Sequence, residues 1–162
     1  MSRPKVEIHE TGWGDPDGEA LRRAMEAEME QRYADRLAEF ASRAADLPDA
    51  LGVDADHVVY VGVAYDENGV PVGHAALRRT NGDLELKRMY VAPSHRGRGV
   101  STALLAGIED AARALGAPRV ILQTGDRQPD AVRLYEREGY TPIPTFSPYE
   151  WIEFSVCMEK HL

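Results

Sequence analysis

Hydrophobic residues in the first third of the chain recur at the spacing of an α-helix. A short alternating segment, Val6 to Glu10, predicts a first strand. From Glu19 to Asp46 an apolar residue then returns every three or four positions, at Leu21, Met25, Met29, Tyr33, Leu37, Phe40 and Ala44. This stripe predicts an amphipathic helix, continuous or broken into two near Tyr33, with Asp15 and Pro16 as its cap and first residue.

The middle of the chain changes to the shorter period of β-strands. His57 to Tyr65 and Val70 to Arg79 are apolar segments separated by a turn that contains Asn68-Gly69. A second Asn-Gly pair, Asn81-Gly82, leads into a third apolar segment, Leu84 to Val91. Asn-Gly turns connect neighbouring antiparallel strands, so these three segments are predicted to form consecutive antiparallel strands.

The last part of the chain alternates between helix and strand patterns. Apolar residues from Val100 to Leu115 fall on one helical face, and a short apolar strand follows over Arg119 to Thr124. The next helix is predicted from near Pro129 to Gly139, with Tyr140 starting a further strand. Trp151 to Met158 alternates and predicts the final strand.

The turn between the strand ending at Val91 and the helix starting near Val100 has the chemistry of a phosphate site. Gly97 and Gly99 lack the Cβ atoms that would keep an anion away from the backbone, and the first helical amides have no partner within a helix. Arg96 and Arg98 add positive charge. This turn therefore predicts a pyrophosphate site, with an arginine-rich helix cap as the alternative.

Two better-known phosphate loops do not fit this turn. It has no lysine, which a Walker loop requires, and Thr102 stands where a dinucleotide fingerprint needs its third glycine. The stretch KRMYVAPSHRGRGVSTALL instead resembles the acetyl-CoA-binding motif of the GNAT superfamily, the GCN5-related N-acetyltransferases. That motif is Q/R-x-x-G-x-G/A, and its fixed positions fall on Arg96, Gly99 and Ser101. Ser101 departs from the usual glycine or alanine but is also small.

A later segment supports the same resemblance. Residues 128–140, QPDAVRLYEREGY, are similar to the family motif N-x-x-A-x-x-L-Y-x-x-x-G-F/Y, with Gln128 in place of the asparagine. The similarity covers about residues 57–161. It implies one α/β domain over residues 1–162, with a mixed, mostly antiparallel sheet of six or seven strands flanked by helices on both faces.

The resemblance also implies where acetyl-CoA would bind. Its pyrophosphate would meet the six residues of the turn and helix start, which are Arg96, Gly97, Arg98, Gly99, Val100 and Ser101. Its pantetheine arm would lie along the backbone of Met89, Tyr90 and Val91, where a β-bulge would direct an amide to the thioester oxygen. The side chains of these three strand residues are expected in the core. Gln128 completes the expected cofactor contacts.

Acetyl transfer to an amine by direct attack in a ternary complex needs a proton acceptor and a donor to the leaving thiolate. Glu85 occupies the strand on which many members of the family carry a glutamate base, and His74 is the rival. Tyr135 falls on the family position whose phenol donates to the cofactor sulfur. Cys157 has no activating neighbour in the sequence and is expected to be a buried structural thiol rather than a nucleophile.

The acceptor is expected to be a small amine or amino acid. Tyr33, Phe146 and Tyr149 are the aromatic residues expected to line its site. An acidic protein slightly favours a cationic acceptor, and one compact domain favours a small molecule over a protein. A non-catalytic module that binds acyl-CoA is the alternative, since it would keep the turn and the strand but would not need Tyr135.

Composition and charge argue against several other classes of protein. A net charge of −8 argues against nucleic-acid binding, and no segment is apolar enough to span a membrane. A single cysteine rules out an internal disulfide and, with an N-terminus that is no signal peptide, predicts a cytoplasmic protein. The histidines and acidic residues show no metal-ligand spacing, so no metal is expected. A homodimer is compatible with the sequence.

Overall fold

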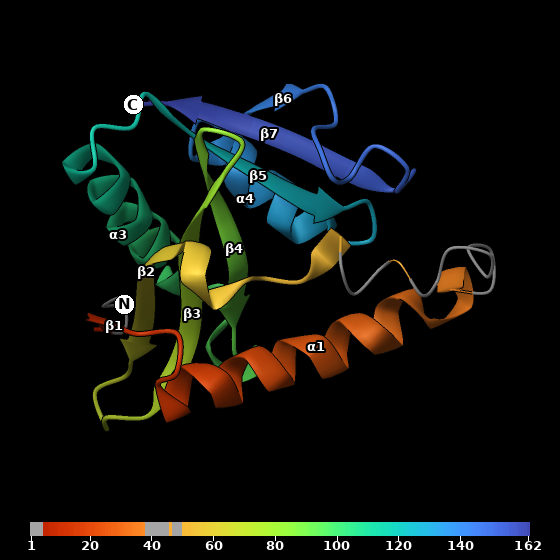
Figure 1. Ribbon diagram of the computed structural model, residues 1–162. Coiled ribbons are helices and arrows are strands. Elements are labelled where there is room, and N and C mark those ends of the chain that lie inside the picture. The colour runs from red at the N-terminus through yellow and green to blue at the C-terminus, as the bar shows by residue number, and fades with distance from the viewer. Residues whose placement is uncertain (1–4, 38–45, 47–49) are drawn as a thin grey trace.

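The computed structural model describes residues 5–37, 46 and 50–162, which form one mixed sheet with helices on both of its faces (Figure 1). Seven strands are arranged in the order β1-β2-β3-β4-β5-β7-β6. The strands are β1 Glu7–Thr11, β2 Val58–Tyr65, β3 Pro71–Thr80, β4 Asp83–Val91, β5 Arg119–Gly125, β6 Thr141–Ile143 and β7 Ser155–His161. The helices are α1 Pro16–Leu37, α3 Val100–Ala114 and α4 Pro129–Arg137, with short 3-10 turns at Ala55–His57 and Pro93–His95. The predicted mostly antiparallel α/β fold is confirmed.

One parallel pair interrupts the antiparallel sheet. β4 and β5 pair in parallel, and their register covers only Leu84–Leu86 against Val120–Leu122. β4 continues to Val91 and stays paired with β3, while β5 continues to Gly125 and stays paired with β7. The carboxyl halves of β4 and β5 therefore lie in one sheet without pairing to each other, as Figure 1 shows.

Two apolar clusters hold the helices on the sheet. α3 and α4 pack on one face, where Leu77, Leu86, Leu104, Ile108, Leu122 and Tyr135 belong to the main core. α1 packs on the other face, where Leu21, Val61, Val63, Ala76 and Tyr90 form a smaller core. β3 approaches α3 so closely that a Cβ on Gly73 would lie 2.9 Å from the Leu104 side chain. The expected helix cover on both faces is confirmed.

Local chemistry accounts for the ends of the helices. The Asp15 carboxylate accepts a hydrogen bond from the Gly18 amide at 3.0 Å, so Asp15 caps α1 as predicted. Gly99, at the N-terminus of α3, has a φ of 85°, and Gly116 beyond its C-terminus has a φ of 75°. Both angles fall in the region that favours glycine.

The structure decides between two alternatives for the first helix and shows that one predicted strand boundary was wrong. α1 runs without a break through Tyr33, because no glycine or proline interrupts the chain after Gly18 until beyond the end of the helix. The predicted remainder of the helical stripe, including Phe40 and Ala44, lies outside the described residues. The final strand starts at Ser155 rather than Trp151, because Ile152 and Ser155 donate backbone hydrogen bonds within turns. No helix of the described part of the chain is long and apolar enough to cross a membrane.

Candidate active site

The glycine-rich loop leaves its backbone amides available. Residues 96–99 are exposed, and α3 starts directly after them with the buried Val100. Gly97 and Gly99 have φ angles of 73° and 85°. No backbone hydrogen bond within the described residues uses the amides of Gly97, Arg98 or Gly99. These donors lie at the N-terminus of a 15-residue helix, where the helix dipole favours an anion.

The two arginines of this loop differ in their contacts. Arg96 donates from Nε to the Val91 carbonyl at 2.9 Å and from Nη1 and Nη2 to both oxygens of Glu28 at 2.9 and 2.8 Å. This pairing lowers the pKa of the Glu28 carboxyl. Arg98 is exposed and makes no side-chain hydrogen bond or ion pair in the described chain. Arg96 thus ties the loop to β4 and α1, and Arg98 is the cation left for a ligand.

β4 contains a bulge next to the expected thioester-binding backbone. Tyr90 pairs with His74 and Lys87 with Ala76, so Arg88 and Met89 together stand opposite Ala75. Arg88 has a φ of 55°, a left-handed conformation that is uncommon for a non-glycine residue. The bulge lies immediately before Tyr90 and includes Met89, the first residue of the predicted segment Met89-Tyr90-Val91. Tyr90 and Val91 are buried and Met89 is half-buried, as expected of core side chains.

His74 supports this bulge and is not free to act as a base. It is fully buried, and its Nδ1 lies 2.9 Å from the Arg88 carbonyl while Arg22 Nη1 lies 3.0 Å from its Nε2. A neutral ring with its proton on Nδ1 satisfies both contacts, because it donates to the carbonyl and accepts from Arg22. Burial, assisted by the positive charges of Arg22 and Arg88, lowers the pKa of His74 to about 4.

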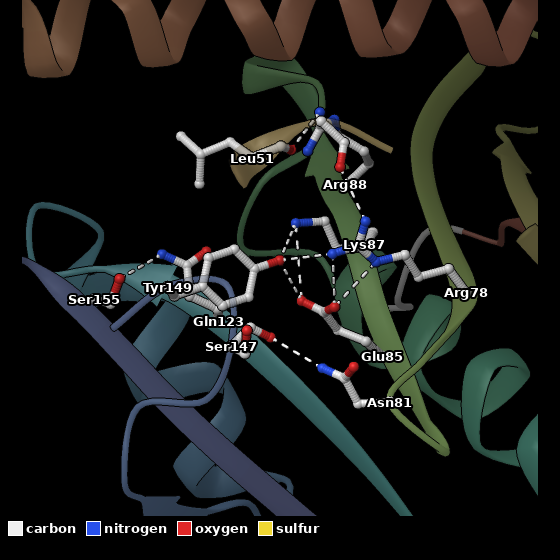
Figure 2. Close-up of polar contacts among 11 residues, drawn as sticks. Leu51, Arg78, Asn81, Glu85, Lys87, Arg88, Gln123, Ser147, Tyr149 and Ser155 are labelled. Atoms are coloured by element: carbon white, nitrogen blue, oxygen red, sulfur yellow. Dashed lines mark hydrogen bonds and ion pairs between the residues drawn. The ribbon is translucent and has the colours of Figure 1, made fainter. Parts of the chain in front are cut away.

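Glu85 lies in a buried network on the α1 face of the sheet (Figure 2). Its Oε1 accepts hydrogen bonds from Arg78 Nε at 3.0 Å and Nη2 at 2.9 Å, and its Oε2 accepts one from the Tyr149 hydroxyl at 2.7 Å. The Glu85 side chain is 0% exposed. The carboxylate is therefore held in a fixed position and has no surface on which to meet a substrate directly.

Lys87 is a member of this network that the sequence reasoning missed. Its Nζ donates to the Tyr149 oxygen at 2.8 Å and lies 3.8 Å from Glu85 Oε2. Burial lowers its pKa to about 7, although Glu85 opposes this shift. It directly follows the last β4 residue, Leu86, that pairs with β5. Strand alternation places Lys87 on the same face as Glu85, and this was the signal available in the sequence.

Tyr135 lies on α4 with an uncommitted hydroxyl. The ring is buried and meets the Tyr140 ring edge-on, with centroids 5.7 Å apart. Burial alone raises the pKa of the phenol, so it stays protonated at neutral pH. Its hydroxyl makes no hydrogen bond with the described residues. The phenol is therefore a proton donor with no committed acceptor.

Other contacts place α4 relative to the loop. The Thr102 hydroxyl, at the start of α3, donates a hydrogen bond of 3.2 Å to Glu138 at the end of α4. This contact fixes the end of α4 to the start of α3. Gln128 occupies the N-cap position of α4 but makes no capping hydrogen bond with its side chain.

The three predicted acceptor aromatics are differently placed. Tyr33 stacks on Phe154 with centroids 4.9 Å apart, and its ring lies so close to β5 that a Cβ on Gly125 would clash with it. Phe146 meets Tyr149 edge-on at 5.4 Å. Tyr149 is 0% exposed, so it supports the site from within and does not line an open surface. Tyr33 and Phe146 keep partly exposed side chains.

Neither a thiol nucleophile nor a metal centre stands out near this network. Cys157 is a buried free thiol whose pKa is raised, chiefly by burial. Within the described ranges, no three His, Cys, Asp or Glu side chains are grouped so that they could hold a metal ion. The candidate site therefore consists of an anion site made of backbone amides, the phenol of Tyr135, and the buried acid–base network around Glu85.

Comparison with known proteins is consistent with this arrangement. Residues 19–140 match the model of the acetyltransferase (GNAT) family. Over 93 residues the chain is 39% identical to an IAA acetyltransferase of Azospirillum brasilense, which covers 57% of this chain and 61% of that protein. Over 64 residues it is 39% identical to the aminoalkylphosphonate N-acetyltransferase of Salmonella typhimurium, which covers 40% of this chain and 42% of that protein. The chain thus matches about three-fifths or less of the length of these two relatives.

Solved structures extend the likeness to the whole fold. A Klebsiella pneumoniae protein described as an acyl-CoA N-acyltransferase superposes with a TM-score of 0.77 at 29% identity, covering 97% of both chains. An N-acetyltransferase from Thermoplasma acidophilum, solved in complex with coenzyme A, superposes with a TM-score of 0.65 at 16% identity over 98% of this chain and 99% of that one. At this identity the second likeness concerns the fold alone.

Proposed function

Because this chain belongs to the acetyltransferase (GNAT) family, we propose that it is an acetyl-CoA-dependent N-acetyltransferase. The reaction transfers the acetyl group to a primary amine of a small molecule or amino acid by direct attack. One observation carries the proposal: the unpaired amides of Gly97, Arg98 and Gly99 at the start of α3 follow a bulged strand that has parted from β5. This combination offers an anion site beside free strand backbone.

The proposed contacts with acetyl-CoA follow from that arrangement. The amides from Gly97 to Ser101 and the free guanidinium of Arg98 bind the pyrophosphate, while Arg96 holds the loop in place. The backbone of Met89 to Val91, which starts within the bulge, takes the pantetheine arm as an added strand. An amide turned out of register by a bulge is suited to polarise the thioester carbonyl.

We assign proton removal from the acceptor ammonium to the network of Glu85, Tyr149 and Lys87. Glu85 acts through this network rather than by direct contact, because its carboxylate has no exposed surface. Lys87 is the member that exchanges a proton near neutral pH, since its pKa is about 7. Tyr135 donates a proton to the departing thiolate, consistent with its protonated and uncommitted hydroxyl.

The names of the relatives support a small acceptor. They include acetyltransferases named for IAA, streptothricin and aminoalkylphosphonate. The competing class, a module that binds acyl-CoA without reacting it, would not need Tyr135. A Tyr135→Phe variant separates the classes, because only an enzyme would lose turnover while keeping its affinity for acetyl-CoA. Cytoplasmic location and a homodimer stay predictions.

Titration calorimetry with acetyl-CoA tests the proposal. Wild-type protein should bind with micromolar affinity, and Gly99→Pro should abolish binding because proline cannot adopt a positive φ. Gly82→Pro is the matched control, since Gly82 also has a positive φ, 84°, but lies in the β3–β4 turn. A folded wild type that does not bind acetyl-CoA would refute the proposal, as would equal losses in the two variants.

A further inference from the structure

Arg88 has an unusual position for an arginine. Its backbone forms the bulge of β4, and its side chain lies between α1 and the Glu85 network, as Figure 2 shows. The side chain is half-buried. Arg88 therefore places its charge between α1 and the network, one residue before the backbone assigned to the thioester.

The guanidinium of Arg88 is only partly satisfied. Nη2 donates to the Leu51 carbonyl at 3.0 Å, and Arg88 forms no ion pair with a carboxylate of the described residues. Two carboxylates favour its charge at longer range, Glu26 from α1 and Glu85 from β4, and Glu85 is already bound to Arg78. Burial lowers the pKa of Arg88. An arginine fork that is taken out of water without a carboxylate is costly.

The surroundings of Arg88 add further positive charge. Arg78 of β3 adds to the lowering of the Arg88 pKa. The pKa of Arg22 in α1 is lowered chiefly by burial, and Arg88 adds to this shift. Lys87 precedes Arg88 in the sequence. Arg22 is bound to His74 and the Trp13 carbonyl and has no carboxylate partner in the described ranges. Arg88 and Arg22 thus form no ion pair with the described residues, and the nearby carboxylates of Glu26, Glu19 and Asp15 act on them only at longer range.

We propose that Arg88 binds an anionic group of the acceptor, so that the acceptor is an amine that also carries a carboxylate, phosphate or phosphonate. The inference rests on the proposed acetyltransferase function and specifies its substrate class. A planar fork with free N–H groups matches the two oxygens of such a group. The bulge breaks the alternation of β4, so the Arg88 and Lys87 side chains lie on the same side of the strand, toward α1 (Figure 2). The anion and the amine therefore belong to one small molecule. The unpaired guanidinium of Arg88 also disfavours a purely cationic polyamine.

Paired acceptors test this inference. Thiol release from acetyl-CoA is measured with the common L-amino acids, β-alanine and aminomethylphosphonate, and with the amide of each amino acid, which keeps the amine but lacks the anion. We expect the best anionic acceptor to exceed its amide by about 10- to 100-fold in kcat/KM, the range of one charge-assisted contact. Arg88→Gln should remove this difference by slowing only the anionic acceptor. Arg88→Lys, which keeps the charge without the fork, should restore part of it.

Controls separate this inference from the proposed function. Arg79→Gln removes an exposed arginine of the neighbouring strand β3 and should leave both rates unchanged. Calorimetry should show that Arg88→Gln still binds acetyl-CoA. Three results would overturn the role of Arg88 while the cofactor still binds: no turnover of any anionic amine, equal rates for acids and amides, or equal losses for both in Arg88→Gln. Loss of acetyl-CoA binding by wild type would instead refute the proposed function.

Discussion

His74 makes the stability of this protein depend on pH in a way that can be calculated. Its pKa is lowered from 6.5 to about 4 in the folded state. The unfolded chain therefore takes up a proton below pH 6.5, whereas the folded chain resists protonation until about pH 4. Because His74 is held neutral in the folded state, the fold loses stability as the pH falls from about 6.5 to about 4. Below about pH 4 the folded and unfolded states are both protonated, and the loss does not grow further.

The size of the effect follows from the same two values. The difference in protons bound by the unfolded and folded chains, integrated from about pH 7.5 to pH 5, is about 1.5. At 1.36 kcal/mol per unit this lowers the free energy of unfolding by about 2 kcal/mol. His74→Asn is the variant to compare, because its amide can still donate to the Arg88 carbonyl but does not titrate. Other groups with lowered pKa values, such as the carboxyls of Glu28 and Asp66, are present in both proteins. Their contributions cancel in the comparison.

Urea unfolding followed by circular dichroism at the two pH values measures this effect. Wild type should lose about 2 kcal/mol more than His74→Asn on acidification, whatever the stability of the variant at neutral pH. Identical pH dependence in the two proteins would refute the reasoning. It would mean that His74 titrates normally and is not held neutral between Arg22 and the Arg88 carbonyl.

Three further predictions concern turnover and packing. In a pH profile of thiol release, kcat/KM of wild type should rise through about pH 7, because Lys87 accepts a proton only when it is neutral. The Lys87→Met variant should lack this rise. A wild-type profile that is flat from about pH 6 to 8 would exclude Lys87 as the titrating group. Tyr135→Phe should lower kcat by about 100-fold with the Kd for acetyl-CoA unchanged, and an unchanged kcat would favour a binding module. Leu104→Ala should lower the free energy of unfolding in urea by about 2–5 kcal/mol, because Leu104 is buried against Gly73. A loss below about 1 kcal/mol would show that the two residues are not tightly packed.

Local patterns in the sequence were enough to predict most of the elements. Three of these patterns depend on the conformational preferences of a few neighbouring residues: the Asn-Gly turns, the apolar segments of β3 and β4, and the glycines at 97 and 99. The one boundary error has a local cause as well. Trp151 to Phe154 alternate like a strand but form turns whose side chains pack around Ile152.

The tertiary structure alone decided how the candidate site works, because its contacts join residues far apart in the chain. Glu85 and Tyr149 are 64 positions apart, and Glu28 and Arg96 are 68 apart. Glu85 looked like an accessible base and His74 like its rival, but their burial and partners give both of them supporting positions. The pKa of Lys87 and the unpaired charge of Arg88 also depend on burial and on neighbours from other elements. Periodicity determines which residues face inward, whereas only folding determines which charges meet there.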